Sequence, residues 1–180
     1  MASMEAEVKA LVLKNPSYQI WVTGHSLGGA MASLASTWLG YYNIALRKNI
    51  ILYTFGMPRV DGARGTTDVT CQAPLQRTLA AERKNIVEKS HCADELSRYD
   101  PALSYKMLLL SAVAYDPVHP QECLDNSLPY AEFQLQTVVT KNCDFADHGC
   151  SGYVAVSRAL KAIVVAFRGS LDLIKHSPNS

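Results

Sequence analysis

Apolar and polar positions in the first part of the chain predict two helices and two strands. Residues 4–14 carry apolar side chains at helical spacing, which predicts a surface-covering helix with Ser3 as its N-cap. Residues 18–23 (YQIWVT) are rich in β-branched and aromatic side chains and predict a strand, and the small residues of 30–40 predict a helix. Residues 49–55 (NIILYTF) are almost continuously apolar, which is typical of a strand in a parallel sheet covered on both faces.

The second part of the chain predicts one buried helix and three strands. Residues 101–115 have the length and the broad apolar surface of a buried helix, and residues 116–129 have the composition of a loop. Strands are predicted over residues 133–140, 152–157 and 162–168. We therefore expect an α/β fold, with a mostly parallel central sheet and flanking helices. The strand at residues 18–23 is expected to lie between those at residues 49–55 and 162–167, which are apolar enough for central positions.

Residues 61–95 differ from the segments on either side. Turn-forming residues open this stretch, and a charged segment without a strong apolar face follows them. This composition predicts a linker or an exposed helix. The whole chain of 180 residues has the length of about one domain.

Composition excludes several classes of protein. The chain is 48% hydrophobic and 18% charged, with a net charge of +1, so a folded globular protein is expected and a nucleic-acid partner is not. The longest mainly apolar run, residues 107–115, is far shorter than the ~20 residues of a membrane-spanning helix.

The cysteines give a weak indication of an oxidising compartment. None of the five forms a CxxC pair, which argues against a zinc ribbon or a thioredoxin-like site. Cys143 and Cys150 bracket a turn-rich loop that a disulfide would close, so we expect a secreted protein with one unpaired cysteine. A weak metal site at His148 is the less favoured alternative, and we expect no metal. Because Glu5 and Glu7 lie where a signal peptide is apolar, we expect no export signal in the chain as given.

One motif carries recognisable chemistry. Residues 24–28, Gly-His-Ser-Leu-Gly, match the nucleophile elbow, in which a sharp turn between a strand and a helix exposes the serine hydroxyl. With Gly and Ser each near ~7% of residues, chance matches are uncommon but do occur. An ordinary glycine-rich turn is the alternative, but the preceding strand and the following small-residue helix favour the elbow.

These residues resemble a known family. WVTGHSLGGAMASLAS followed by NIILYTFGMPRV is similar to the elbow segment of the class 3 (fungal-type) lipases, which are α/β-hydrolases. LSYKMLLLSAVAYDP and CDFADHGCSGYVAVSRALKAIVVAFRGS resemble the N-terminal part of the same family, particularly its secreted nematode-like members. The resemblance implies hydrolysis of carboxylic esters, typically acylglycerols, without metal or organic cofactor.

The order of the segments departs from the family pattern. The AFRGS strand precedes the elbow in the family and follows it here, at residues 166–170. The resemblance therefore implies an incomplete or permuted lipase domain, with residues 1–62 as the elbow half, 63–94 as a linker and 95–180 as the N-terminal-like half. The match stops at residue 60, so the lid and the region of the catalytic acid and histidine are missing.

Site roles carry over only in part. Ser26 would be the nucleophile that forms an acyl-enzyme, with the Leu27 N–H in the oxyanion hole and Ser170 completing it. Gly24, His25 and Gly28 shape the elbow, and His25 is expected to be structural because successive strand side chains point to opposite sides. The acid and the base stay unassigned, since none of the remaining histidines matches the family position: His91, His119, His148 and His176.

The sequence thus predicts a crippled ester hydrolase acting on a lipid ester, with the lipid–water interface as a further partner and the oligomeric state open. An inactive lipid-binding or structural lipase-like protein is the alternative, and a misassembled coding sequence that never folds stably is the third. Five aromatic residues could either pack in the core or line a groove for an acyl chain, and the sequence leaves both alternatives open: Tyr18, Trp21, Trp38, Tyr41 and Tyr42.

Overall fold

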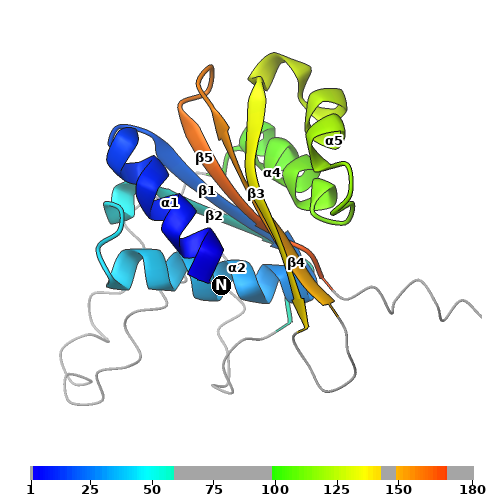
Figure 1. The fold of residues 1–180 in the computed structure, drawn as a ribbon, viewed down its shortest axis with the longest axis horizontal. Helices are drawn as coiled ribbons and strands as arrows, with labels where there is room; N and C mark the ends of the chain where they lie inside the picture. Colours follow the sequence, from blue (N-terminus) through cyan, green and yellow to red (C-terminus); the bar gives the residue numbers. More distant parts are fainter. Residues whose placement is uncertain (1, 59–98, 143–148, 170–180) are drawn as a thin grey trace, which may run out of the picture.

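A five-stranded sheet with helices on both faces forms the described part of the chain, residues 2–58, 99–142 and 149–169 of the computed structural model (Figure 1). The strands are β1 (Gln19–His25), β2 (Ile50–Phe55), β3 (Phe133–Asn142), β4 (Gly149–Ser157) and β5 (Ala162–Phe167). The helices are α1 (Ala2–Lys14), α2 (Leu27–Tyr41), α4 (Pro101–Val113) and α5 (Pro120–Ser127), with short 3-10 turns at Arg47–Asn49 and Pro129–Ala131.

The strand order is β2-β1-β5-β4-β3. β1 pairs in parallel with β2 on one side and with β5 on the other, which confirms the predicted neighbours of the elbow strand. The expectation of a mostly parallel sheet was wrong, because β5 pairs antiparallel with β4 and β4 with β3. Only residues 158–161 join β4 to β5, and so short a connection permits a hairpin but no parallel crossover. Among the strands of the described residues, β2 stands at the edge of the sheet and not in its centre.

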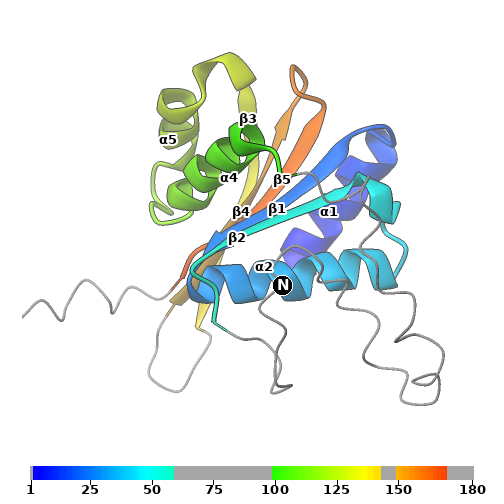
Figure 2. The ribbon, with the colours of Figure 1, turned by 180° about the vertical axis from the view of Figure 1, so that it is seen from behind.

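Helices α1 and α2 cover one face of the sheet (Figure 2). Val8 and Leu11 of α1 and Leu39 of α2 are buried there against alternate residues of β5, such as Ile163 and Val165. α1 begins at Ala2, so Ser3 lies inside the helix and the prediction of Ser3 as its N-cap was wrong. The apolar face predicted over residues 4–14 is the face that packs.

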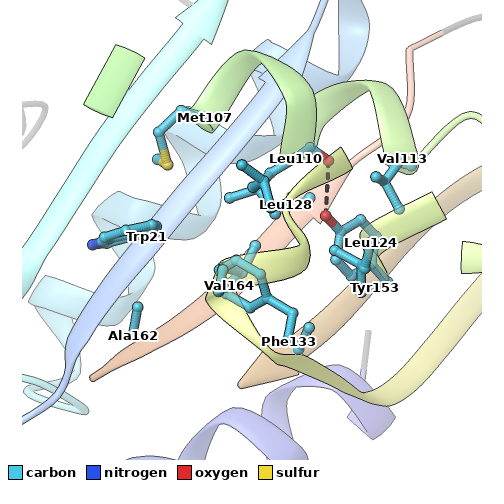
Figure 3. Close-up of a cluster of buried hydrophobic side chains, with 14 residues drawn as sticks. Trp21, Met107, Leu110, Val113, Leu124, Leu128, Phe133, Tyr153, Ala162 and Val164 are labelled. Carbon is cyan, nitrogen blue, oxygen red and sulfur yellow. Dashed lines mark hydrogen bonds between the residues drawn. The ribbon is translucent and has the colours of Figure 1, made fainter. Parts of the chain in front are cut away.

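Helices α4 and α5 cover the opposite face, where the other side of β5 packs (Figure 3). The predicted buried helix begins at Pro101, with Asp100 as an N-cap whose carboxylate accepts from the N–H groups of Ala102 and Leu103. Tyr153 is 1% exposed in this core, and its hydroxyl donates to the Leu110 carbonyl at 2.8 Å. Burial raises the pKa of Tyr153 well above its ordinary value.

The loop predicted over residues 116–129 contains helix α5, so that prediction was wrong. The sequence of α5 is mostly polar, and few apolar positions mark it as a helix. Two kinds of contact hold α5 against the sheet. Leu124 is buried, and the Gln121 side chain donates to the Phe133 carbonyl and accepts from the Leu135 N–H, both at 2.8 Å. The residues predicted as linker, 63–94, lie outside the described residues.

We expect Tyr153→Phe to lower the free energy of unfolding by about 1 kcal/mol, because the variant loses a buried hydrogen bond while keeping the packed ring. Tyr130→Phe is the matched control, since Tyr130 is 58% exposed. Urea unfolding of both variants measures the difference. Equal stability of the two variants would contradict the packing described here.

Candidate active site

Ser26 stands at a sharp turn between the end of β1 and the start of α2. Its backbone has φ 54° and ψ −128°, a conformation that costs energy for a residue other than glycine. Two hydrogen bonds hold this turn: the Ser26 N–H donates to the Phe55 carbonyl at 2.8 Å, and the Ser26 carbonyl accepts from the Gly29 N–H at 2.9 Å. This is the geometry that the elbow motif predicts, with a half-buried serine at the apex.

The elbow glycines allow three backbones to approach one another. A Cβ atom on Gly24 would overlap the Gly28 carbonyl group, so the end of β1 could not pass the first turn of α2. A Cβ atom on Gly28 would overlap the Phe167 carbonyl oxygen at the end of β5. Each glycine therefore has a packing reason of its own, in addition to the shape of the turn.

Gly169, two residues after the end of β5, lies directly beside Ser26. A Cβ atom on Gly169 would lie 2.6 Å from the His25 carbonyl oxygen, 2.6 Å from the Tyr115 hydroxyl and 3.1 Å from the Ser26 Cβ atom. Ser170, the predicted second member of the oxyanion hole, lies outside the described residues. Gly169 is the residue before Ser170 and lies beside Ser26, and the oxyanion role of Ser170 stays a prediction.

Tyr115 is a site residue that the sequence did not single out. Its hydroxyl lies 2.8 Å from His25 Nδ1, and the same hydroxyl faces Gly169. The side chain of His25 is exposed, and its Nδ1 atom is engaged by Tyr115. Tyr115 belongs to the AYDP sequence directly after α4, and this position gives no signal of a hydroxyl directed at the elbow.

The first turn of α2 supplies hydrogen-bond donors beside Ser26. The first N–H groups of a helix have no acceptor within the helix, and the helix dipole places partial positive charge there. Leu27 is the first residue of α2, so its N–H belongs to this set. Its predicted oxyanion role stays a prediction.

Within the described ranges, no hydrogen bond joins the Ser26 hydroxyl to an imidazole. His91, His148 and His176 lie outside those ranges. His119 precedes α5, where its Nδ1 is 3.8 Å from Asp116 Oδ2. Backbone hydrogen bonds from His119 and Val118 lower the pKa of Asp116. The described residues therefore have the geometry of a nucleophile elbow at Ser26, and they contain no assigned acid or base.

Of the five cysteines, Cys123 and Cys150 lie within the described residues. Cys123 has a free thiol, and burial raises its pKa. Cys143 lies outside the described residues, so the Cys143–Cys150 disulfide stays a prediction. Among the described residues, no group of three His, Cys, Asp or Glu side chains is arranged to hold a metal ion, and no helix there is long and apolar enough to cross a membrane.

Comparison with known proteins gives a family match that includes the elbow. The family model described as Lipase (class 3) matches residues 1–99. "Secreted mono- and diacylglycerol lipase 1" of Fusarium solani is 44% identical over 62 residues, which are 33% of this chain and 16% of that protein. "Lipase" of Rhizomucor miehei is 46% identical over 66 residues, 36% and 18% of the two chains. "Lipase ZK262.3" of Caenorhabditis elegans is 35% identical over 77 residues, 42% and 22% of the two chains.

The matched segment thus spans about a fifth of the length of these relatives. No solved structure matches the chain.

We expect Gly28→Ala to destabilise the protein by about 2–3 kcal/mol, because the added methyl group overlaps backbone at the end of β5 and neither side can yield easily. Gly40→Ala in the same helix is the matched control. Its Cβ atom would have the Arg47 side chain as nearest neighbour, at 3.6 Å, so a neutral or slightly stabilising effect is expected. Thermal and urea unfolding compare the two, and similar stabilities would show that α2 does not approach β5 as closely as described.

Proposed function

Because the chain belongs to the class 3 lipase family, we propose that it is a carboxylic ester hydrolase of the acylglycerol lipase type, with Ser26 as its nucleophile. The observation that carries the proposal is the strained backbone of Ser26 between β1 and α2. Strain at a non-glycine residue is retained where a side chain has to be presented at a fixed point.

The proposed reaction proceeds through an acyl-enzyme. The Ser26 hydroxyl oxygen attacks the ester carbonyl carbon, the C–O bond to the alcohol breaks, and the serine proton leaves with that alcohol. The N–H of Leu27, together with Ser170, stabilises the negative charge on the carbonyl oxygen. Water then hydrolyses the acyl-enzyme and regenerates Ser26. No step requires a metal or an organic cofactor.

The swapped order of the two halves is compatible with one site. β1 comes from residues 1–62 and β5 from residues 95–180, and these two strands pair in parallel over six residue pairs, from Gln19 with Ala162 to Gly24 with Phe167. This pairing supports the proposal that residues 1–62 and 95–180 are halves of one lipase domain joined through 63–94. It also supports an oxyanion hole assembled from both halves.

The names of two relatives support a proposal for substrate and location. The Fusarium solani protein and the Penicillium camembertii relative, which is 41% identical over 66 residues, are both named as secreted mono- and diacylglycerol lipases. We propose lipid esters of this class as substrates and an extracellular location. The competing proposal is an inactive lipid-binding or structural protein, which the unassigned base and acid favour.

Labelling with a fluorophosphonate ester probe tests the nucleophile. We expect the purified chain to label at Ser26, Ser26→Ala to abolish labelling, and Ser36→Ala, a serine further along α2, to label like the wild type. A folded protein that resists the probe would support the inactive alternative.

Turnover of a p-nitrophenyl ester tests the strength of the activity. We expect a rate at least ~10³-fold below that of a complete triad enzyme, since an elbow and oxyanion hole without a base retain only part of the catalysis. Alanine variants of four histidines extend the test: His91, His119, His148 and His176. Efficient acylglycerol hydrolysis that one of these changes abolishes would identify a recruited base and overturn the expectation of a crippled enzyme.

Peptide mapping of protein secreted into an oxidising medium tests the disulfide. The β3–β4 register supports the pair, since Asn142, the neighbour of Cys143, lies opposite Gly149, the neighbour of Cys150. We expect a Cys143–Cys150 peptide, and a loss of about 2 kcal/mol in stability for Cys143→Ser because the closed loop is short. Cys123→Ser is the control, since its thiol is free. Recovery of Cys143 and Cys150 as free thiols would reject the pair.

A further inference from the structure

Three aromatic side chains form a connected cluster at the C-terminal end of α2. The Trp38 and Tyr42 rings lie 5.4 Å apart between centroids, and the Tyr42 and Tyr41 rings lie 5.0 Å apart. Tyr41 is 63% and Tyr42 is 61% exposed, and Leu46 in the following loop is 63% exposed. Large apolar groups gathered on a surface in this way mark an interaction site more often than single exposed residues do.

The cluster is not part of the candidate active site. Ser26 precedes the first residue of α2, whereas the aromatic cluster lies around its last turn, and a 15-residue helix is about 22 Å long. In Figure 1 the two ends of α2 lie far apart, and the chain runs from its C-terminal end through a loop to the 3-10 turn that precedes β2. Its function is therefore separate from the chemistry at the elbow.

Basic side chains border the aromatic cluster. Arg47 and Lys48 are exposed, and the Arg47 side chain packs on Gly40, its Cγ atom 3.6 Å from where a Cβ atom of Gly40 would lie. Lys9 of α1 lies over the Trp38 ring, 5.5 Å from its centroid. The Glu5 Oε1 atom lies 2.6 Å from Lys9 Nζ, so this ion pair offsets the positive charge of Lys9. Residues 37–50 contain no Asp or Glu, so the charge from Arg47 and Lys48 is not offset within this segment.

The combination fits one kind of partner best. Tryptophan and tyrosine favour the boundary between water and lipid because their rings have an apolar body and a polar edge. Lysine and arginine near a negatively charged lipid surface each contribute about 1 kcal/mol of attraction. A second copy of the chain fits less well, because a symmetric contact through this surface would bring Arg47 and Lys48 of both copies together.

We propose that the surface formed by Trp38, Tyr41, Tyr42, Leu46, Arg47 and Lys48 binds an anionic lipid–water interface. We name it the α2-end surface. The aromatic side chains enter the headgroup region, and the two basic side chains contact lipid phosphates or carboxylates. Binding here concerns adsorption to lipid and does not depend on whether Ser26 is catalytically competent.

Vesicle flotation tests the α2-end surface, with all variants made in Ser26→Ala protein so that no lipid is hydrolysed. We expect binding to vesicles of phosphatidylcholine mixed with phosphatidylserine, and at least tenfold weaker binding to phosphatidylcholine alone. Tyr41→Ser/Tyr42→Ser and Arg47→Glu should each weaken binding to the mixed vesicles about tenfold or more. The matched controls are Tyr105→Ser/Tyr130→Ser and Arg158→Glu, which change exposed residues elsewhere and should bind like the parent.

Tryptophan fluorescence gives a second readout. The chain has two tryptophans, and Trp21 is 5% exposed in the core, so a blue shift on adding mixed vesicles would report Trp38. Absence of vesicle binding, or binding that the α2-end variants and the controls affect equally, would overturn the proposal. Sedimentation showing a dimer that Tyr41→Ser/Tyr42→Ser dissociates, without vesicle binding, would instead assign the surface to a second copy.

Discussion

The close approach of α2 to the end of β5 is the constraint on which the rest of the structure depends. Gly28 lies against the Phe167 carbonyl with no room for a side chain, and Gly169 lies equally close to the His25 carbonyl oxygen and the Tyr115 hydroxyl, beside Ser26. β1 and β5 pair in parallel immediately before this point, from Gln19 with Ala162 to Gly24 with Phe167. Two segments more than a hundred residues apart in the chain are therefore fixed in one register at the position where the candidate chemistry takes place.

That contact also explains how both layers of helices reach the elbow. α2 begins at Leu27 on one face of the sheet, and Tyr115 follows α4 on the other. The Tyr115 hydroxyl meets His25 Nδ1 and faces Gly169, so a side chain from the α4 layer contacts both strand ends that flank Ser26. Contacts from outside its own strand and helix thus stabilise the turn that contains Ser26. A strained backbone conformation persists only where several surrounding contacts fix it.

Local patterns identified the elements that are strongly apolar and missed those that depend on partners. β1, β2, β5 and the elbow were predictable because continuous apolar runs and a Gly-x-Ser-x-Gly turn leave few alternatives. Helix α5 was missed, since its polar sequence is held by Leu124 and by the bonds of Gln121 to β3, which no local pattern displays. The mixed character of the sheet follows from the four-residue connection between β4 and β5, which permits only an antiparallel pair.

The candidate site shows the same division. Ser26 and its glycines occupy adjacent positions and form a motif, whereas Tyr115 reaches the site from 89 residues further along the chain. The acid and the base of a hydrolase are likewise brought to a nucleophile by the fold and not by spacing in the sequence. The resemblance could therefore suggest a nucleophile, and it could not supply an acid or a base.

The presence of serine at position 26, where glycine would be less strained, favours a functional elbow over a purely structural turn. A φ of 54° with ψ −128° costs a serine of order 1–3 kcal/mol, whereas glycine adopts it with little strain. Glycine already occupies four neighbouring positions where the backbone lies close to other atoms, at 24, 28, 29 and 169. A turn that served only to connect β1 to α2 would be more stable with a fifth glycine at position 26. The serine is consistent with a requirement for its hydroxyl at the apex, which favours a nucleophile over a purely structural turn.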